Sequence, residues 1–182
     1  RGGQGEKEVR IIAGKHRGRV LSQFRGMDIR PTADRVKESL FQIIGDRLVG
    51  ARVLDLFCGS GALGLESLSR GAKEVVFNDV SRESLAVLQK NLTALREEGQ
   101  LMQSDYAACL MRVRGKFDVI FCDPPYQMDC REDVLSRILQ YDRLAAGGVV
   151  IWESEREEEA PAGWQRSDLR RYGRTKIAFF TR

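Results

Sequence analysis

The sequence predicts an α/β protein whose mostly parallel sheet carries helices on both faces and ends in an antiparallel hairpin. From residue 52 onward, short apolar runs alternate with amphipathic segments, which is the pattern of repeated strand–helix units. The last two apolar segments are joined only by a tight turn around Gly173, so we expect their strands to pair antiparallel. Two polar motifs each follow a buried strand, and ligands of such sheets bind where the strands end.

The chain has 182 residues, a size that fits one domain with a substantial core. We expect residues 1–8 to be a flexible or vector-derived end, residues 9–29 to form a basic N-terminal extension, and residues 30–182 to form the core of a single domain. No apolar run approaches the roughly 20 residues of a membrane helix, so we expect a cytoplasmic protein without a membrane partner. No apolar face in the pattern demands a dimer, and we expect a monomer.

The four cysteines are scattered and lack paired C-x-x-C spacing; they are Cys58, Cys109, Cys122 and Cys130. This spacing does not support a zinc site, and we expect no metal. Free, mostly buried thiols in a reducing cytoplasm are the simpler interpretation.

The N-terminal extension is rich in basic residues. Residues 9–13 and 20–21 have strand character and flank a turn that carries Lys15, Arg17 and Arg19. We interpret this segment as a short hairpin, or two strand fragments, with a basic tip. Such a tip suits contact with phosphate groups, but a solvated loop would have the same composition, and both interpretations stay open.

The first helix is predicted to open with the segment Arg30-Pro31-Thr32. Thr32 can cap it, and Asp34 suits the positive end of its dipole. An apolar stripe then continues to residue 44, and Gly45 is a plausible end of the helix. Residues 30–37 contain more charged residues than a helix with a purely structural role would need. We therefore expect this segment to have a functional role as well.

The core elements follow in regular order. Strands are predicted at residues 53–57, 74–79, 101–104, 117–122 and 148–152, and the closing hairpin at residues 164–172 and 175–181. Helices are predicted at residues 63–70 and 81–98, in a short segment from residue 105, and around residues 134–139. The strand at 117–122 is the clearest, because its apolar run is almost unbroken.

A glycine motif follows the first strand of the core. Gly59, Gly61 and Gly64 match G-x-G-x-x-G between a strand and a helix, where glycine lets the backbone turn tightly and approach a ligand. Asp79 closes the next strand, 20 residues after Gly59, where a carboxylate can accept hydrogen bonds from ribose hydroxyls. The pattern alone does not separate a dinucleotide from S-adenosylmethionine.

Two further carboxylates bear on the choice of cofactor. Asp55, at the end of the first strand, can order the glycine loop and face the ammonium group of a methionine moiety, which favours S-adenosylmethionine. A dinucleotide site would place a pyrophosphate at the helix start and would favour an apolar approach there. Asp55 could instead be a local turn cap. Asp105 could accept from an adenine amino group or only cap its own helix, and the sequence favours neither.

The second motif is Asp123-Pro124-Pro125-Tyr126, directly after the strand at 117–122. The prolines fix the chain and offer no N–H, so the Asp123 carboxylate and the Pro124 carbonyl can act as paired acceptors. Paired acceptors suit the –NH₂ group of a base and favour a pyramidal nitrogen whose lone pair can attack a methyl group. Tyr126 can stack on the base, an interaction worth about 1–3 kcal/mol. A plain β-turn is the weaker alternative, given the glycine motif upstream.

These motifs together resemble the bacterial 16S ribosomal RNA guanine-N2 methyltransferases, an RsmD-like family of class I enzymes that depend on S-adenosylmethionine. The resemblance extends from residue 10 to the end of the chain and rests on residues 10–14, 30–41, 55–71 and 123–126. It implies a Rossmann-like methyltransferase fold with a seven-stranded sheet, and a guanine flipped into the cleft. The implied substrate is 16S rRNA, in the small ribosomal subunit or its assembly intermediate.

The motifs and the resemblance together define the predicted site residues. The catalytic set is Asp123, Pro124, Pro125 and Tyr126. The set that binds S-adenosylmethionine is Arg30, Thr32, Asp55, Phe57, Gly59, Ser60, Gly61, Gly64, Asp79, Val80, Ser81, Asp105 and Tyr106. The set that contacts RNA is Lys15, Arg17, Arg19, Arg30, Arg35 and Lys37.

Three other functions are compatible with parts of the sequence. An adenine-N6 DNA methyltransferase would use the same paired acceptors, but the chain has no added target-recognition region. An NAD-dependent oxidoreductase would explain the glycines and leave Asp-Pro-Pro-Tyr without a role. A non-catalytic RNA-binding module would rest on the basic N-terminal segment alone.

Overall fold

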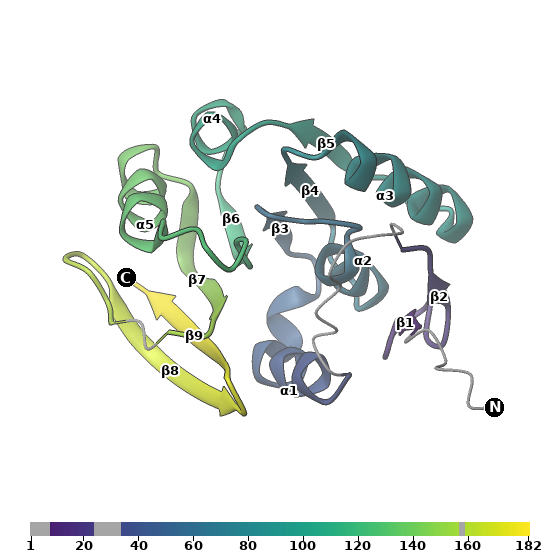
Figure 1. Cartoon of the computed structure of the whole chain (residues 1–182), viewed down its shortest axis with the longest axis horizontal. Helices are drawn as coiled ribbons and strands as arrows, with labels where there is room; N and C mark the ends of the chain where they lie inside the picture. The colour runs from purple at the N-terminus through teal and green to yellow at the C-terminus, as the bar shows by residue number, and fades with distance from the viewer. Residues whose placement is uncertain (1–7, 24–33, 157–158) are drawn as a thin grey trace.

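The computed structural model describes residues 8–23, 34–156 and 159–182 (Figure 1). Within these residues, seven strands form one sheet in the order β5-β4-β3-β6-β7-β9-β8. Their bounds are β3 Arg52–Asp55, β4 Glu74–Asp79, β5 Gln100–Gln103, β6 Phe117–Cys122, β7 Leu144–Ser154, β8 Gln165–Tyr172 and β9 Thr175–Thr181. Neighbouring strands from β5 to β7 pair parallel, whereas β9 pairs antiparallel with both β7 and β8. The predicted Rossmann-like sheet with its antiparallel C-terminal hairpin is confirmed.

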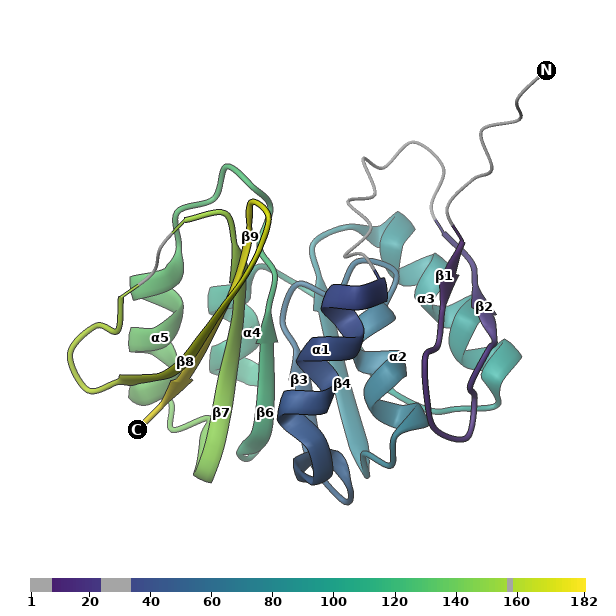
Figure 2. The same ribbon diagram turned by 90° about the horizontal axis from the view of Figure 1, so that it is seen from below.

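Helices cover both faces of the sheet (Figures 1 and 2). Their bounds are α1 Asp34–Ile44, α2 Ala62–Ser69, α3 Arg82–Leu95, α4 Tyr106–Arg112 and α5 Arg131–Gln140, and a 3-10 turn at Gly45–Leu48 follows α1. One apolar core lies between the sheet and α1, α2 and α3, and a second lies between the sheet and α4 and α5. In the described part of the chain, no helix is long and apolar enough to span a membrane.

The N-terminal extension forms the predicted hairpin, with β1 Val9–Arg10 paired antiparallel to β2 Val20–Leu21. The hairpin packs beside the core: Lys15 N–H donates to the Ser69 carbonyl at 2.9 Å, and Ser22 N–H donates to Asn91 Oδ1 at 2.8 Å. Gly14 makes the approach possible, because a Cβ there would lie 1.9 Å from the Ser69 carbonyl oxygen. The hairpin is therefore anchored to α2 and α3.

A buried ion cluster joins the hairpin, α1 and α2. Glu66 of α2 is fully buried, and its carboxylate accepts from the backbone N–H of Ile12 at 2.8 Å and of Ala13 at 3.2 Å. Lys37 lies 3.2 Å from Glu66 Oε1 and Arg70 lies 3.0 Å from Oε2. Both oxygens of this buried carboxylate thus have partners.

The position of Lys37 corrects one prediction made from the sequence. Lys37 is only 3% exposed, and burial lowers its pKa although the Glu66 carboxylate opposes the shift. A buried, paired lysine does not fit the predicted contact with RNA, and we do not retain it in the RNA-binding set. The ion pair of Lys37 with Glu66 could not be predicted from the local sequence, because Glu66 lies 29 positions away along the chain.

Several strand boundaries differ from prediction, and the largest differences are at β3 and β7. β3 ends at Asp55 rather than at residue 57, because the chain already turns toward the glycine loop there. β7 begins at Leu144, four residues earlier than predicted, through a segment with two glycines that carries little strand signal. The predicted helix start at Arg30, Pro31 and Thr32 lies outside the described residues, and the described part of α1 begins at Asp34.

Candidate active site

The two motifs meet at the carboxyl edge of adjacent strands. β3 and β6 pair parallel with Asp55 opposite Phe121, and Leu56 N–H donates to the Phe121 carbonyl at 3.1 Å. Gly59, the first glycine of the loop, follows Asp55 by four residues. Asp123 follows Phe121 of β6 by two residues. The fold therefore brings both halves of the predicted site to one edge.

Asp79 at the end of β4 organises the glycine loop. One of its oxygens accepts from Gly59 N–H at 2.9 Å, and the other accepts from Ser81 N–H, also at 2.9 Å. Gly59 has φ +52°, and no atom lies within 4 Å of the place that a Cβ would occupy. Its positive φ, rather than a steric contact, is therefore the reason that glycine suits this position.

The other two glycines have steric reasons as well. Gly61 caps α2 with φ +91°, and a Cβ there would meet Leu88 at 2.4 Å. A Cβ on Gly64 would meet the Phe77 ring of β4 at 2.2 Å, so glycine lets α2 pack directly on the sheet. In the G-x-G-x-x-G match, Gly59 therefore permits a backbone turn, and Gly61 and Gly64 permit close packing of the backbone against Leu88 and Phe77.

Asp55 lies beneath the glycine loop and is 2% exposed. Its carboxylate accepts from Gly64 N–H at 3.0 Å, so the predicted ordering of the loop is seen directly. Burial raises the pKa of the Asp55 carboxyl to about 7; the Gly64 N–H opposes the shift, and the Asp123 and Asp79 carboxylates add to it. The cleft is therefore acidic, and a cation bound there would relieve the crowding of negative charge.

Aromatic and polar side chains that follow β3 and β5 lie where the adenine is predicted to bind. The rings of Phe57 and Tyr106 lie 5.9 Å apart between centroids. Asp105 caps α4 by accepting from Ala108 N–H at 2.7 Å and is itself exposed. The capping interpretation is therefore satisfied, and contact with adenine stays a prediction. Val80 is 66% exposed beside this region, and Ser60 Oγ donates to Gln23 at 3.3 Å.

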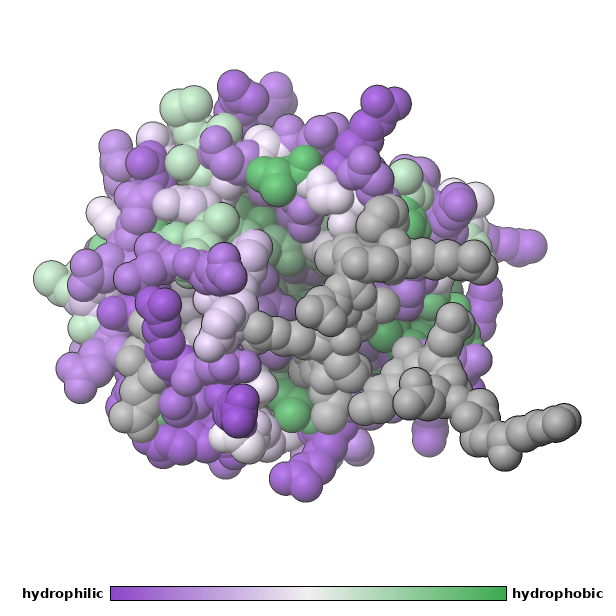
Figure 3. Space-filling model, viewed as in Figure 1, coloured by the Kyte–Doolittle hydropathy of each residue, from purple (hydrophilic) through white to green (hydrophobic). Residues whose placement is uncertain are grey.

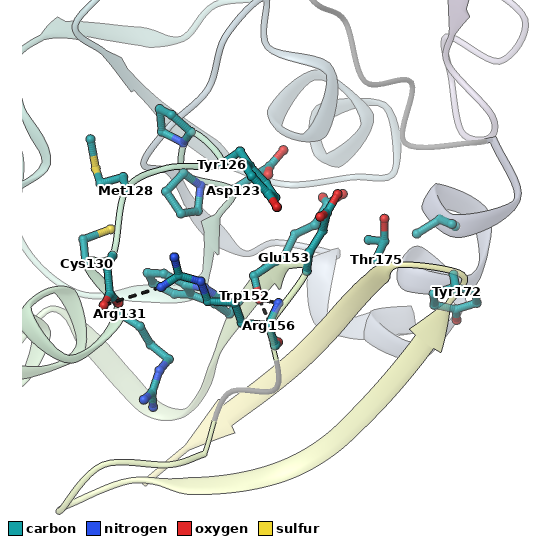
Figure 4. Close-up of a pocket in the computed structure, with 16 residues that line it drawn as sticks. Asp123, Tyr126, Met128, Cys130, Arg131, Trp152, Glu153, Arg156, Tyr172 and Thr175 are labelled. Carbon is teal, nitrogen blue, oxygen red and sulfur yellow. Dashed lines mark hydrogen bonds and ion pairs between the residues drawn. The ribbon is translucent and has the colours of Figure 1, made fainter.

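The segment 123–126 forms one wall of a cavity of about 330 Å³ (Figure 4). Tyr126 is 59% exposed, and its ring lies beside Asp123 and Glu153 in the close-up view. The opposite wall comes from the end of β7 and from the turn between β8 and β9. The cavity adjoins the cofactor half through Asp123 and is large enough for a planar base.

Sequence reasoning missed the far wall of this cavity. Trp152, Glu153, Tyr172 and Thr175 all contribute to it, although none belongs to a recognisable motif. Only the pairing of Cys122 with Trp152 across β6 and β7 brings Glu153 level with Asp123. Knowledge of the strand order would have found Glu153, because it lies near the end of the next strand at the same edge.

The residues predicted to contact RNA differ in their solvent exposure and in their contacts with the rest of the protein. Arg17 and Arg35 are exposed. Lys15 remains 60% exposed but lies 2.5 Å from Glu97, and Arg19 donates to the Ala94 carbonyl at 3.0 Å. Arg30, like Thr32, lies outside the described residues. Across residues 8–23, 34–156 and 159–182, no group of three His, Cys, Asp or Glu side chains could hold a metal ion.

A parallel sheet that combines a glycine loop, an acid at the end of the second core strand and Asp-Pro-Pro-Tyr at one edge defines a Rossmann-like methyltransferase. The chain belongs to the family described as conserved hypothetical protein 95, whose model matches residues 9–181. The predicted membership of an RsmD-like family is confirmed.

Named relatives agree with this assignment. The chain is 35% identical over 164 residues to ribosomal RNA small subunit methyltransferase D of Haemophilus influenzae, covering 86% of this chain and 85% of that protein. The solved structure of Escherichia coli yhhF has a TM-score of 0.87 and 33% identity, with 96% and 98% of the two chains covered. A Thermus thermophilus 16S rRNA N2 G1207 methyltransferase, solved with AdoMet and guanosine, has a TM-score of 0.70 over 94% of this chain and 48% of that chain; at 24% identity it supports the fold alone.

Proposed function

We propose that this protein transfers a methyl group from S-adenosylmethionine to the N2 amine of a guanine in 16S ribosomal RNA. The observation that carries the proposal is the meeting of the glycine loop and the segment 123–126 at one edge of β3 and β6. The Haemophilus influenzae relative is named a small-subunit rRNA methyltransferase and is similar over most of both chains. The NAD alternative leaves the segment 123–126 and the acidic cleft without a role.

The residues of the cofactor half fit S-adenosylmethionine, which when bound would supply an electrophilic methyl group on a sulfonium. The carboxylates of Asp79 and Asp123 help to raise the pKa of Asp55, and such an acidic site favours a cationic ligand. We assign Asp55 to the ammonium group, Asp79 to the ribose hydroxyls and Asp105 to the adenine amine. Phe57 and Tyr106 would flank the adenine.

In the chemical half, Asp123 and the Pro124 carbonyl would accept hydrogen bonds from the two N–H groups of the target amine. These bonds would favour a pyramidal nitrogen whose lone pair is aimed at the methyl group that the sulfonium would supply. The methylated amine would have one proton to release, and we assign Asp123 as its acceptor. Tyr126 would stack on the base. Most of the rate gain would come from in-line positioning.

Guanine suits the cavity better than adenine, the nearest alternative. Guanine has two donors at N2 and one at N1, whereas adenine has an acceptor at N1. Glu153 lies near the end of β7 at the level of Asp123 and lines the same cavity. Its carboxylate could accept from guanine N1–H and would repel the N1 lone pair of adenine. This is the observation that favours guanine.

The proposed setting is the cytoplasm, where a monomer would act on the small ribosomal subunit or on an assembly intermediate. We assign Lys15, Arg17, Arg19 and Arg35 to contacts with the RNA backbone. Three of the four lie in the hairpin that is anchored to α2 and α3, so the basic tip has a fixed position relative to the site.

The test is methyl transfer to unmodified small subunits and to naked 16S rRNA by the wild type and by Asp123→Ala. We expect transfer to a single guanine by the wild type and a loss of at least about a hundredfold in the variant, with the affinity for S-adenosylmethionine nearly unchanged. Mapping the modified nucleotide identifies the base and the atom. Wild-type turnover in Asp123→Ala, or methylation of adenine, would contradict the proposal.

A further inference from the structure

The hairpin of β8 and β9 carries an unusual concentration of positive charge. Between residues 165 and 176 there are five basic residues and one acidic residue, a net charge of +4. The formal net charge of the whole chain is also +4, so the remaining residues sum to neutrality. The basic residues are Arg166, Arg170, Arg171, Arg174 and Lys176. The hairpin is therefore a basic region on a chain that is otherwise balanced in charge.

Most of this charge is displayed to solvent. Arg166, Arg170, Arg171 and Arg174 are exposed, and the surface over β8 and β9 is hydrophilic (Figure 3). Asp168, the single acid, lies 3.1 Å from Arg170. Exposed ion pairs of this kind contribute little to stability.

The turn of the hairpin reaches the cavity beside the segment 123–126. Tyr172 and Thr175 pair across the turn, and both line that cavity (Figure 4). Arg171 is the neighbour of Tyr172 and Arg174 is the neighbour of Thr175. Each of these arginines is therefore next in sequence to a residue that lines the cavity in which the target base is proposed to lie.

The turn is held in place by contacts with other elements. The Tyr172 hydroxyl is hydrogen bonded to Ser39 of α1, and Lys176 Nζ donates to the Glu155 carbonyl at 2.9 Å. Gly173 has φ +60°, which allows the tight two-residue connection. A fixed turn presents its arginines in one place, so little ordering is required when a ligand binds.

We propose that the β8–β9 turn is a second RNA-binding surface, in which Arg171 and Arg174 contact phosphates that flank the target nucleotide. The inference rests on the proposed function, since it requires an RNA substrate. The β1–β2 hairpin and the β8–β9 hairpin lie on either side of α1 in both ribbon views (Figures 1 and 2). The tip of the β1–β2 hairpin contacts Ser69 and Glu97 at the carboxyl ends of α2 and α3, whereas the residues beside the β8–β9 turn line the cavity, so the turn is the basic surface next to the target base.

The test is the salt dependence of 16S rRNA binding by the wild type and by Arg171→Gln/Arg174→Gln. Removing one phosphate contact lowers the slope of log K against log salt by about 0.7 for a single strand, so we expect a decrease of about 1.4 and weaker binding at low salt. Arg171→Lys/Arg174→Lys should restore the slope, because charge rather than shape is required. Arg112→Gln, which changes an exposed arginine at the end of α4, is the matched control and should leave the slope unchanged.

The outcomes separate the two proposals. An unchanged slope and affinity in Arg171→Gln/Arg174→Gln, with normal methyl transfer by the wild type, would overturn this inference alone. A wild type that neither binds nor methylates 16S rRNA would overturn the proposed function and this inference with it. S-adenosylmethionine binding should be equal in all variants and shows that each is folded.

Discussion

Asp55 is a buried carboxyl at the edge of the site, and its ionisation lowers the free energy of unfolding. It is 2% exposed, and its carboxylate accepts from the backbone N–H of Gly64 at 3.0 Å. Its pKa lies near 7, well above the usual value of an aspartate, chiefly because it is buried. Strongly shifted pKa values of this kind gather at functional sites, which agrees with the proposed contact of Asp55 with the ammonium group of the cofactor.

The raised pKa predicts how stability varies with pH. Between about pH 4 and pH 7 the folded protein holds a proton on Asp55 that the unfolded chain has released, so this carboxyl lowers the free energy of unfolding as pH rises through that interval. Asp55→Asn keeps an acceptor for Gly64 and cannot ionise. We expect urea denaturation to show the variant gaining stability relative to the wild type as pH rises across this interval. A constant difference would mean that Asp55 titrates normally.

Glu153 is the residue that we expect to decide which base is accepted. Small subunits can be reconstituted with 2-aminopurine in place of the target guanine, which keeps the N2 amine but replaces N1–H by an acceptor. The wild type should prefer guanine by about tenfold or more, because each unmatched buried polar group costs on the order of 1–3 kcal/mol. Glu153→Gln, whose amide can donate, should narrow this ratio.

The control is Glu155→Gln, a change of the same kind two residues along the same cavity wall. It should leave the preference for guanine intact. If Glu153→Gln lowers the rate for both bases equally, then Glu153 has a structural role and does not read the base.

At the scale of elements, α2 connects the site to the N-terminal hairpin. Its first turn holds Gly64 above Asp55, and two residues further on Glu66 binds the backbone of Ile12 and Ala13. The same carboxylate pairs with Lys37 of α1. Three elements that are distant in sequence therefore share one fully buried charge.

Removal of Glu66 should be among the most destabilising changes in the chain. Glu66→Ala would leave the buried Lys37 without its counter-charge, and such changes cost about 3–5 kcal/mol. The double variant Glu66→Gln/Lys37→Met removes both charges and keeps an acceptor for Ile12, so it should recover more than half of that loss. Urea denaturation measures both. A single variant within about 1 kcal/mol of the wild type would show that the pair contributes little.

Element prediction succeeded where the local pattern was strong. The bounds of β4, β6 and β9 match the prediction residue for residue, because each is a continuous apolar or alternating run closed by polar residues. β7 was predicted too short, since its first residues contain glycines whose strand conformation is imposed by the neighbouring strands. Tertiary pairing is not visible in a local window.

At the scale of the whole molecule, the meeting of the glycine loop with Asp55 and Asp79 could be predicted, and the far wall of the base cavity could not. Glycines and closing acids carry a spacing signal, whereas Glu153 and Tyr172 reach the cavity only through the strand order β6-β7-β9-β8. The same limit explains Lys37, whose burial depends on a partner from another element. Local sequence motifs therefore predict the chemical groups of a site, but they do not predict which distant residues will lie beside them.

The proposed contact between the basic tip of the N-terminal hairpin and RNA can be tested by the salt dependence of binding. Lys15→Gln/Arg17→Gln/Arg19→Gln should lower the salt slope of RNA binding by up to about 2, at about 0.7 for each phosphate that the tip neutralises. Glu97→Gln is the control, because it removes the acid beside Lys15 without removing a basic residue. Its slope should equal that of the wild type. If the triple variant also binds like the wild type, the tip is a solvated loop.

The place of β9 has a consequence for how the protein is completed. This strand lies between β7 and β8 although it follows both in the chain, so β8 cannot dock on β7 and wait for its neighbour. β8 therefore joins the sheet only through β9, and the residues beside the turn line the cavity with Trp152 and Tyr126 only when β9 is paired with β7. The glycine loop, by contrast, is held by β3, β4 and α2, so its hydrogen bonds to Asp55 and Asp79 do not depend on the last two strands.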